Sequence, residues 1–259
     1  LQGAHEESHV FNLHRQRWNR ERTDQDSELT QSQHIGISES FTFEFAIEGD
    51  GNFDMLYHFG SVEDIWLGNW GILRTHKEEV NHLLPLPDRP KPSPRTKSLP
   101  CVSGNNPPRA LSPGMPCHKD APVRKYEVVA MNADIEYNKD GDHDPFGIIF
   151  TLAKDEEAIR CKKMNPEPLI LRGNVGECIE VTLHNKLDPI FHHSLIHGYP
   201  RVPVEAPFPP SLRISLHTQL LVYDVRGSDG ATVGFNPDQT ICPGESITYR
   251  WYVDAPVGP

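Results

Sequence analysis

Residues 54–74 read DMLYHFGSVEDIWLGNWGILR, and this stretch decides how the rest of the chain is interpreted. Residues 55–59 are rich in aromatic side chains, Gly60 and Ser61 interrupt them, and residues 70–73 form a second apolar run. Aromatic and apolar runs that are bounded by glycine and serine are typical of strands and turns. The stretch therefore predicts a strand, a short loop and a second strand.

Further segments show strand character. Residues 9–18 (HVFNLHRQRW) alternate large and polar side chains, and residues 41–47 (FTFEFAI) alternate with one apolar face. Residues 124–131 (RKYEVVAM) predict another strand, and residues 167–185 (EPLILRGNVGECIEVTLHN) predict two strands around a glycine turn. Residues 155–163 form a short polar helix candidate. With 24 Pro and 19 Gly to supply turns, the sequence predicts an all-β fold of twisted antiparallel sheet.

The composition limits the classes of function. The chain has 259 residues and 37% hydrophobic residues, which suits one or two domains with a proper core. The formal net charge of −11 argues against a nucleic-acid partner, because such a partner needs clustered Lys and Arg. No run of about 18 apolar residues occurs, so we expect no membrane span. No signal peptide opens the sequence, so we expect a mature chain or part of a longer one.

A proline-rich segment divides the chain. Proline recurs throughout residues 80–124, which favours extended backbone and cannot build a sheet interior. We therefore predict β structure in residues 1–79, a linker over residues 80–124, and a second β unit in residues 125–259. The five Cys lack C-x-x-C spacing, which argues against a structural zinc site. One or two disulfides are possible, and a bridge between Cys101 and Cys117 would staple the linker.

Two stretches of the first unit resemble the cupredoxin domains of multicopper oxidases. The family motif His-Pro-Phe-His-Leu-His-Gly-His matches residues 9–16, with His9 on its first His, a type 1 copper ligand, and His14 on its third, a ligand of the trinuclear centre. Asn12 and Gln16 stand at the other two positions. The alternation would point these side chains to one side of a strand, as coordination requires.

The second stretch is residues 54–74, which resemble the last two strands of such a domain. His58 falls on the first His of the family's His-Cys-His, and Phe59 falls on the Cys. Gly60 falls on the second His, Asp64 on the later His and Asn69 on the axial position. Residues 54–74 therefore keep the family's scaffold residues and lack most of its copper ligands.

Residues 167–251 resemble the opening of another cupredoxin domain. Residues 216–219 (LHTQ) stand where the family has His-Trp-His, so His217 matches one ligand and Gln219 replaces the other. Residues 228–251 follow the family's next segment, with PGES at 243–246 as its turn. Residues 1–79 thus look like the C-terminal half of one cupredoxin domain, and residues 125–259 like the N-terminal part of the next.

The resemblance implies Greek-key cupredoxin halves with copper ligands at His9, His14, His58 and His217. A type 1 copper needs a thiolate and two imidazoles, so Phe59 and Asp64 argue against a blue copper site. The implied function is part of a large bacterial-type copper oxidase, a copper-dependent oxidoreductase that couples oxidation of a metal ion or small phenol to O₂ reduction. The alternative is a non-catalytic structural or assembly module.

Partners and location follow from the same resemblance. Half-domains expose apolar sheet faces and edge strands, so we expect the halves to pair with each other, with other copies of the chain or with other domains of a larger parent. In the first two cases the histidines at 14, 58 and 217 would converge. His192, His193 and His197 form a second group that either binds metal weakly or lies in a solvated loop. We expect an extracellular, periplasmic or cell-surface protein.

Overall fold

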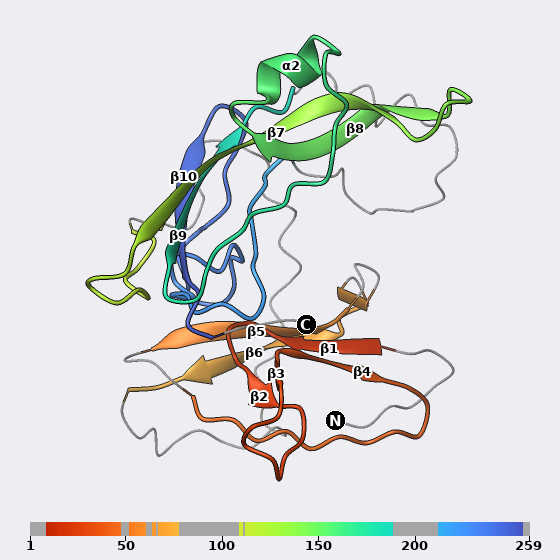
Figure 1. Ribbon diagram of the computed structural model, residues 1–259. Helices are drawn as coiled ribbons and strands as arrows, with labels where there is room; N and C mark the ends of the chain where they lie inside the picture. Colours follow the sequence, from red (N-terminus) through yellow and green to blue (C-terminus); the bar gives the residue numbers. More distant parts are fainter. Residues whose placement is uncertain are drawn as a thin grey trace.

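The computed structural model describes residues 9–47, 52–60, 64–65, 67–77, 109–110, 112–188 and 212–255. Two four-stranded sheets make up most of the regular structure (Figure 1). The first sheet has the order β4-β1-β5-β6, and each neighbouring pair in it is antiparallel. A small two-stranded ribbon, β2-β3, accompanies it. The strands are β1 (His9–Leu13), β2 (Trp18–Asn19), β3 (Leu29–Thr30), β4 (Ser32–Ile35), β5 (Phe53–Phe59) and β6 (Trp70–Thr75).

The second sheet has the order β10-β9-β7-β8. Its outer pairs, β10 with β9 and β7 with β8, are antiparallel, whereas β7 and β9 run parallel, so the prediction of antiparallel sheet is wrong for that pair. A short helix, α2 (Glu156–Arg160), follows β8 and lies over the end of the sheet (Figure 1). The strands are β7 (Val123–Glu136), β8 (His143–Leu152), β9 (Cys178–Asn185) and β10 (Ser246–Tyr252).

These elements confirm the all-β prediction and the hairpin of residues 54–74, in which β5 pairs with β6 from Phe53↔Thr75 to His58↔Trp70. The predicted strand near residue 124 and the helix over 155–163 are also confirmed, the helix being shorter than expected. No helix in the described part of the chain is long and apolar enough to cross a membrane.

Two predicted strands are wrong. Residues 41–47 are not a strand, although Phe43 and Phe45 are half-buried and pack against the core. Phe43 stacks on Phe11 with ring centroids 5.7 Å apart, so the alternating pattern reflects packing of an extended chain that forms no ladder. Residues 168–172 are likewise extended without strand pairing, and Leu169 and Leu171 still cover the core. The alternating pattern in these two segments therefore predicted correctly which side chains pack on the core, and predicted wrongly that the backbone forms strand hydrogen bonds.

One apolar core is shared by the two sheets. It contains Leu13 and Met55 from the first sheet together with Val181, Leu183 and Tyr249 from the second. In Figure 1 the loops between β9 and β10 (blue) reach from the second sheet down to the first. The two halves of the chain therefore pack on each other within a single molecule.

Asp54 joins the halves most directly. Its side chain is 1% exposed and accepts hydrogen bonds from Arg74 Nε at 2.6 Å and from the backbone N–H of Phe235 at 2.7 Å. The backbone N–H of Asp54 donates to Asn236 Oδ1 at 3.2 Å, and Asn236 Nδ2 donates to the backbone carbonyl of Asp54 at 2.7 Å. A second link is the Arg17–Asp254 ion pair at 2.6 Å. These contacts fix Phe235 and Asn236, and Asp254 after β10, on the first half of the chain.

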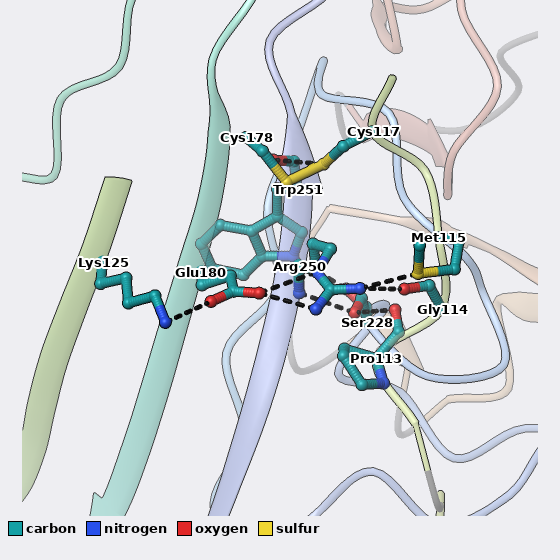
Figure 2. The surroundings of a disulfide bond; sticks show 10 residues. All are labelled: Pro113, Gly114, Met115, Cys117, Lys125, Cys178, Glu180, Ser228, Arg250 and Trp251. Atoms are coloured by element: carbon teal, nitrogen blue, oxygen red, sulfur yellow. Dashed lines mark hydrogen bonds and ion pairs between the residues drawn. A yellow bond between two sulfur atoms is a disulfide. The ribbon is translucent and has the colours of Figure 1, made fainter. Parts of the chain in front are cut away.

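The segment before β7 is held by the second sheet rather than acting only as a spacer (Figure 2). The Ser228 hydroxyl donates to the Pro113 carbonyl at 2.7 Å, and Arg250 donates to the Gly114 carbonyl at 2.9 Å. A disulfide joins Cys117 to Cys178 at the start of β9. The Cys101–Cys117 pairing that we considered from the sequence is therefore wrong, because Cys117 is already bonded across the sheet.

Candidate metal centre

Three histidines from distant parts of the sequence lie together where the halves meet. His14 directly follows β1, and its backbone N–H donates to the Leu56 carbonyl of β5 at 2.9 Å. His58 lies on β5, and His217 lies in the loops that connect β9 to β10. The ring centroids of His14 and His217 are 3.9 Å apart, and those of His14 and His58 are 5.4 Å apart. The predicted convergence of these three side chains is confirmed.

The carboxylate of Asp229 binds two of these imidazoles. His14 Nδ1 lies 3.0 and 3.1 Å from its two oxygens. His217 Nδ1 lies 3.3 Å from the carboxylate and 2.8 Å from the Asp229 backbone carbonyl. An ionised carboxylate and a carbonyl only accept hydrogen bonds, so both Nδ1 atoms carry the proton. When the rings are neutral, their Nε2 atoms therefore carry the lone pairs that a metal ion needs.

Asp229 is itself held rigidly. Its backbone N–H and that of Gly230 donate to Gln239 Oε1 at 2.8 and 3.0 Å, and Gln239 Nε2 donates to the Val225 carbonyl at 2.7 Å. Gly230 has φ +77°, and a Cβ there would overlap the Leu216 carbonyl, so only glycine fits this close approach. The turn thereby places Asp229 beside the loop that carries His217.

The electrostatics follow from burial and from these hydrogen bonds. Burial would raise the pKa of Asp229, but the hydrogen bonds from His14 and His217 outweigh it and lower the pKa to about 2. Burial would lower the pKa of His217, and the Asp229 carboxylate outweighs that effect and raises it. Burial, followed by the nearby His14, lowers the pKa of His58. The carboxylate is therefore ionised and fully paired in the interior.

Three side chains could hold a metal ion. His14, His217 and Asp229 present candidate ligand atoms that all lie within 4.8 Å of one another. His58 Nδ1 is buried and has no hydrogen-bond partner among the described residues, which is costly for a polar atom unless something else binds it. Imidazole is a preferred ligand of copper and zinc, and a carboxylate that orients the other ring nitrogen is typical of such sites.

The fourth predicted ligand, His9, does not join this cluster. Its Nδ1 lies 3.2 Å from Asp64, and its ring meets the edge of Phe59 at 6.0 Å. Asn69 donates to the same Asp64 carboxylate at 3.1 Å. His9 and Asn69 thus both bind the Asp64 carboxylate, and the Phe59 ring lies beside His9.

The remaining candidates have other roles or lie elsewhere. Asn12 and Gln16, which match ligand positions, are buried; the Asn12 side chain donates to the Val10 carbonyl and Gln16 contacts the Met55 sulfur at 3.2 Å. The histidines at 192, 193 and 197 lie outside the described residues. Sequence reasoning missed Asp229, whose only signal was an acidic residue before a glycine in a segment matched to the family.

Tyr223 was also missed. Its side chain is 1% exposed, its ring meets the edge of His217 at 6.1 Å, and its hydroxyl has no hydrogen-bond partner among the described residues. Burial, and then the charge of Asp229, raise the pKa of this phenol well above its usual range. Tyr223 therefore stays neutral and forms one wall of the centre.

No protein-family model matches the chain, and a search of the curated proteins finds no match either.

Proposed function

We propose that this chain is a copper-binding, cupredoxin-like module of multicopper oxidase type. The observation that carries the proposal is the pair of stacked imidazoles, from positions 14 and 217, that donate through Nδ1 to one buried carboxylate. This arrangement fixes both tautomers with Nε2 available, and fixed tautomers are what a metal site built on histidine requires. The resemblance of both halves to cupredoxin domains favours copper among the metals that accept imidazole.

In this proposal His14, His58 and His217 hold the ion and Asp229 orients two of them. A copper ion bound there would supply one-electron redox chemistry. The His14 ring is 6% exposed and the Asp229 carboxylate is fully buried, so the side chains exclude water from that side of the centre. We propose His58 Nδ1 as the third donor, because it is buried without a hydrogen-bond partner among the described residues.

The oxidoreductase activity of a multicopper oxidase would need a type 1 copper site for electron entry, and the described residues at the matching positions do not supply its ligands. Phe59 and Asp64 stand where the thiolate and one imidazole are required, and no other described cysteine lies beside them. Oxidation of a metal ion or phenol coupled to O₂ reduction is therefore proposed only for an assembly with other domains or chains. The hydrogen-bonded His9–Asp64 pair favours the second candidate, a non-catalytic module, for the isolated chain. The disulfide supports an extracellular, periplasmic or cell-surface location.

The test is a copper titration of the purified chain with matched variants. We expect Cu(II) binding with nitrogen couplings in the electron paramagnetic resonance spectrum and no intense blue band. His217→Gln and Asp229→Asn should each weaken binding by roughly tenfold or more. His34→Gln, which changes an exposed histidine on β4, should leave it unchanged.

The outcome that contradicts the proposal is copper affinity that survives His14→Gln combined with His217→Gln, since the ion would then bind elsewhere. Oxygen uptake by the copper-loaded chain with a one-electron donor separates the two candidates. Sustained uptake supports an oxidoreductase, and its absence supports the non-catalytic module.

A further inference from the structure

Residues 112–117, here called the strap, lie against the turn that carries Asp229. The hydroxyl of Ser228, the residue directly before Asp229, donates to the Pro113 carbonyl of the strap at 2.7 Å (Figure 2). One residue earlier in the turn, a Cβ on Gly227 would overlap a carbonyl oxygen of the strap. The backbones of the strap and of the turn are therefore in direct contact, with no room for a side chain between them.

The strap is anchored on the second sheet by one covalent link and by hydrogen bonds (Figure 2). Its last residue, Cys117, forms the disulfide with Cys178 at the start of β9. Arg250 of β10 donates to the Gly114 carbonyl at 2.9 Å, and the same guanidinium is held by Glu180 of β9 at 2.6 and 3.0 Å. Without the disulfide, noncovalent contacts alone would fix the strap on the turn.

Ser228 transmits the position of the strap to the turn. It is 0% exposed, and its hydroxyl accepts the backbone N–H of Arg250 at 2.9 Å while it donates to Pro113. Its own carbonyl accepts the Trp251 indole N–H at 2.9 Å. A hydroxyl has a single donor, and a buried donor without an acceptor is costly. If the strap moved away, Ser228 would have to move or lose its acceptor.

The hydrogen bonds of Asp229 leave little room for such a movement. Its carboxylate lies 3.0 and 3.1 Å from His14 Nδ1 and 3.3 Å from His217 Nδ1. Hydrogen bonds of this kind usually measure about 2.7–3.2 Å, so these are already at the long end of the range. Gln239 holds the backbone N–H of Asp229, and the strap holds the residue before it. A shift of a few tenths of an ångström at Ser228 would therefore break the longer contacts first.

We propose that Ser228 is a positioning residue for the cluster of Asp229 and its two histidines, and that the strap makes this cluster sensitive to reduction. A dithiol reductant would convert the Cys117–Cys178 disulfide into two thiols and would itself become a disulfide. The released strap would no longer hold Ser228, and the carboxylate would no longer fix both imidazole tautomers. The effect on metal affinity rests on the proposed function, whereas the effect on the tautomers needs no metal.

The test uses the full chain without metal, and long-range ¹H–¹⁵N NMR in mildly alkaline solution records the imidazole tautomers and the Nδ1–H signals. In the oxidised chain we expect the Nδ1–H tautomer at His14 and His217. Reduction by a dithiol should mix the tautomers and should speed exchange of the two Nδ1 protons with water roughly tenfold, because their acceptor is no longer held. Ser228→Ala should have the same effect with the disulfide intact, and the exposed His34 should not respond to either change.

Two controls isolate the strap. Ser246→Ala changes an exposed serine at the start of β10 and should leave the tautomers and the exchange rates as in the wild type. Cys117→Ala combined with Cys178→Ala should reproduce the reduced state, and a dithiol added to this variant should have no further effect. If the double variant fails to fold, the reduced wild type and Ser228→Ala carry the comparison.

Copper affinity provides the second readout. The double cysteine variant is titrated without reductant, because a dithiol would itself bind copper, and its affinity should be roughly tenfold weaker than that of the oxidised wild type. If the wild type binds no copper, the proposed function fails, and the NMR comparison of the metal-free chain still decides this inference. Unchanged tautomers and unchanged exchange after reduction and in Ser228→Ala would overturn it. That holds even if both changes lower stability, since the strap would then stabilise the fold without positioning the cluster.

Discussion

Replacing Asp54 with alanine should uncouple the two halves of the chain. The carboxylate is 1% exposed and accepts two hydrogen bonds from Arg74, at 2.6 and 2.9 Å, and one from the Phe235 N–H at 2.7 Å. Burial would raise the pKa of Asp54, but these donors outweigh it and lower the pKa, so the group is ionised at neutral pH. Asp54→Ala removes the acceptor for all three hydrogen bonds at once.

The size of the effect follows from what is left without a partner. A hydrogen bond to a charged group contributes about 1.5–3 kcal/mol, and an unpaired buried donor costs about 1–3 kcal/mol. The Arg74 side chain is 35% exposed, so water recovers part of its solvation and its share must be discounted. The part-buried hydrogen bond from the Phe235 N–H and the discounted share from Arg74 together give a loss of about 3 kcal/mol. For a chain of this size that corresponds to a fall in Tm of about 6–12 °C.

Urea unfolding followed by tryptophan fluorescence measures this loss, because Trp18 and Trp251 are both buried in the shared core. Glu28→Ala is the control, since its ion pair with Arg20 is exposed and such pairs contribute about 0–1 kcal/mol. A loss below about 1 kcal/mol for Asp54→Ala would refute the assignment of Asp54 as the main polar link between the halves.

Three further changes test other parts of the structure. Replacing Cys117 and Cys178 with alanine removes a disulfide between residues 61 positions apart and should lower the free energy of unfolding by about 2–4 kcal/mol. Urea unfolding measures the loss, and the reduced wild type should behave like the variant. The hydrogen bonds from Arg124, and then those from Asn174, lower the pKa of Glu177 to about 2. The contribution of Glu177 to stability should therefore be present above the unfolded pKa of 4.5 and be lost as the pH falls from there towards 2. Glu177→Gln should flatten that part of the acid-unfolding curve, and an unchanged curve would count against the Arg124–Glu177 pair. Gly230→Ala should weaken copper binding and destabilise the chain by about 1–3 kcal/mol, because the added methyl overlaps the neighbouring backbone. The copper titration and urea unfolding measure these two effects. Unchanged copper affinity and unchanged stability would show that the turn can relax.

The sheet elements that the sequence predicted well are those whose local pattern agrees with their final surroundings. The run at 55–59 lies in β5, a central strand with neighbours on both sides, and the alternating residues 179–183 lie in β9. Such strands need apolar side chains wherever they are buried, so their pattern survives in the sequence. The parallel pairing of β7 with β9 left no local signal, because pairing partners are chosen by the whole sheet.

The missed strand β8 shows a different limit. It begins at His143 and contains Pro145, and a stretch with acidic residues and a proline shows little strand character. Because β8 is the edge strand of its sheet, a residue there can lack an N–H without breaking the ladder on both sides. The sequence gives no direct sign of which strand is at an edge, so a strand that contains proline is hard to predict.

The candidate site was predictable only in part. The histidines at positions 14, 58 and 217 stand out because each matches a ligand position in a family motif. Asp229 does not, because its role depends on a partner 215 residues away and on complete burial, and neither is encoded locally. His9 was predicted as a ligand, and its hydrogen bond to Asp64 joins residues 55 positions apart, which no local pattern reveals. Matching a short motif finds side chains that could bind a metal. It cannot show which of them already form hydrogen bonds within the protein.

The buried Asp229 ties formation of the site to assembly of the two halves. An ionised carboxylate that is 0% exposed is strongly unfavourable unless it is paired, and here the pairing comes from His217 in its own half and from His14 in the other. Separating the sheets would therefore leave the second half with a carboxylate that has lost its shorter hydrogen bonds, at 3.0 and 3.1 Å. It would also return His14 and His58 to water and open the shared core around Leu13 and Met55. The unpaired carboxylate and the exposed core both destabilise the separated halves. We therefore expect the halves to pack together and the three histidines to come together in one cooperative step.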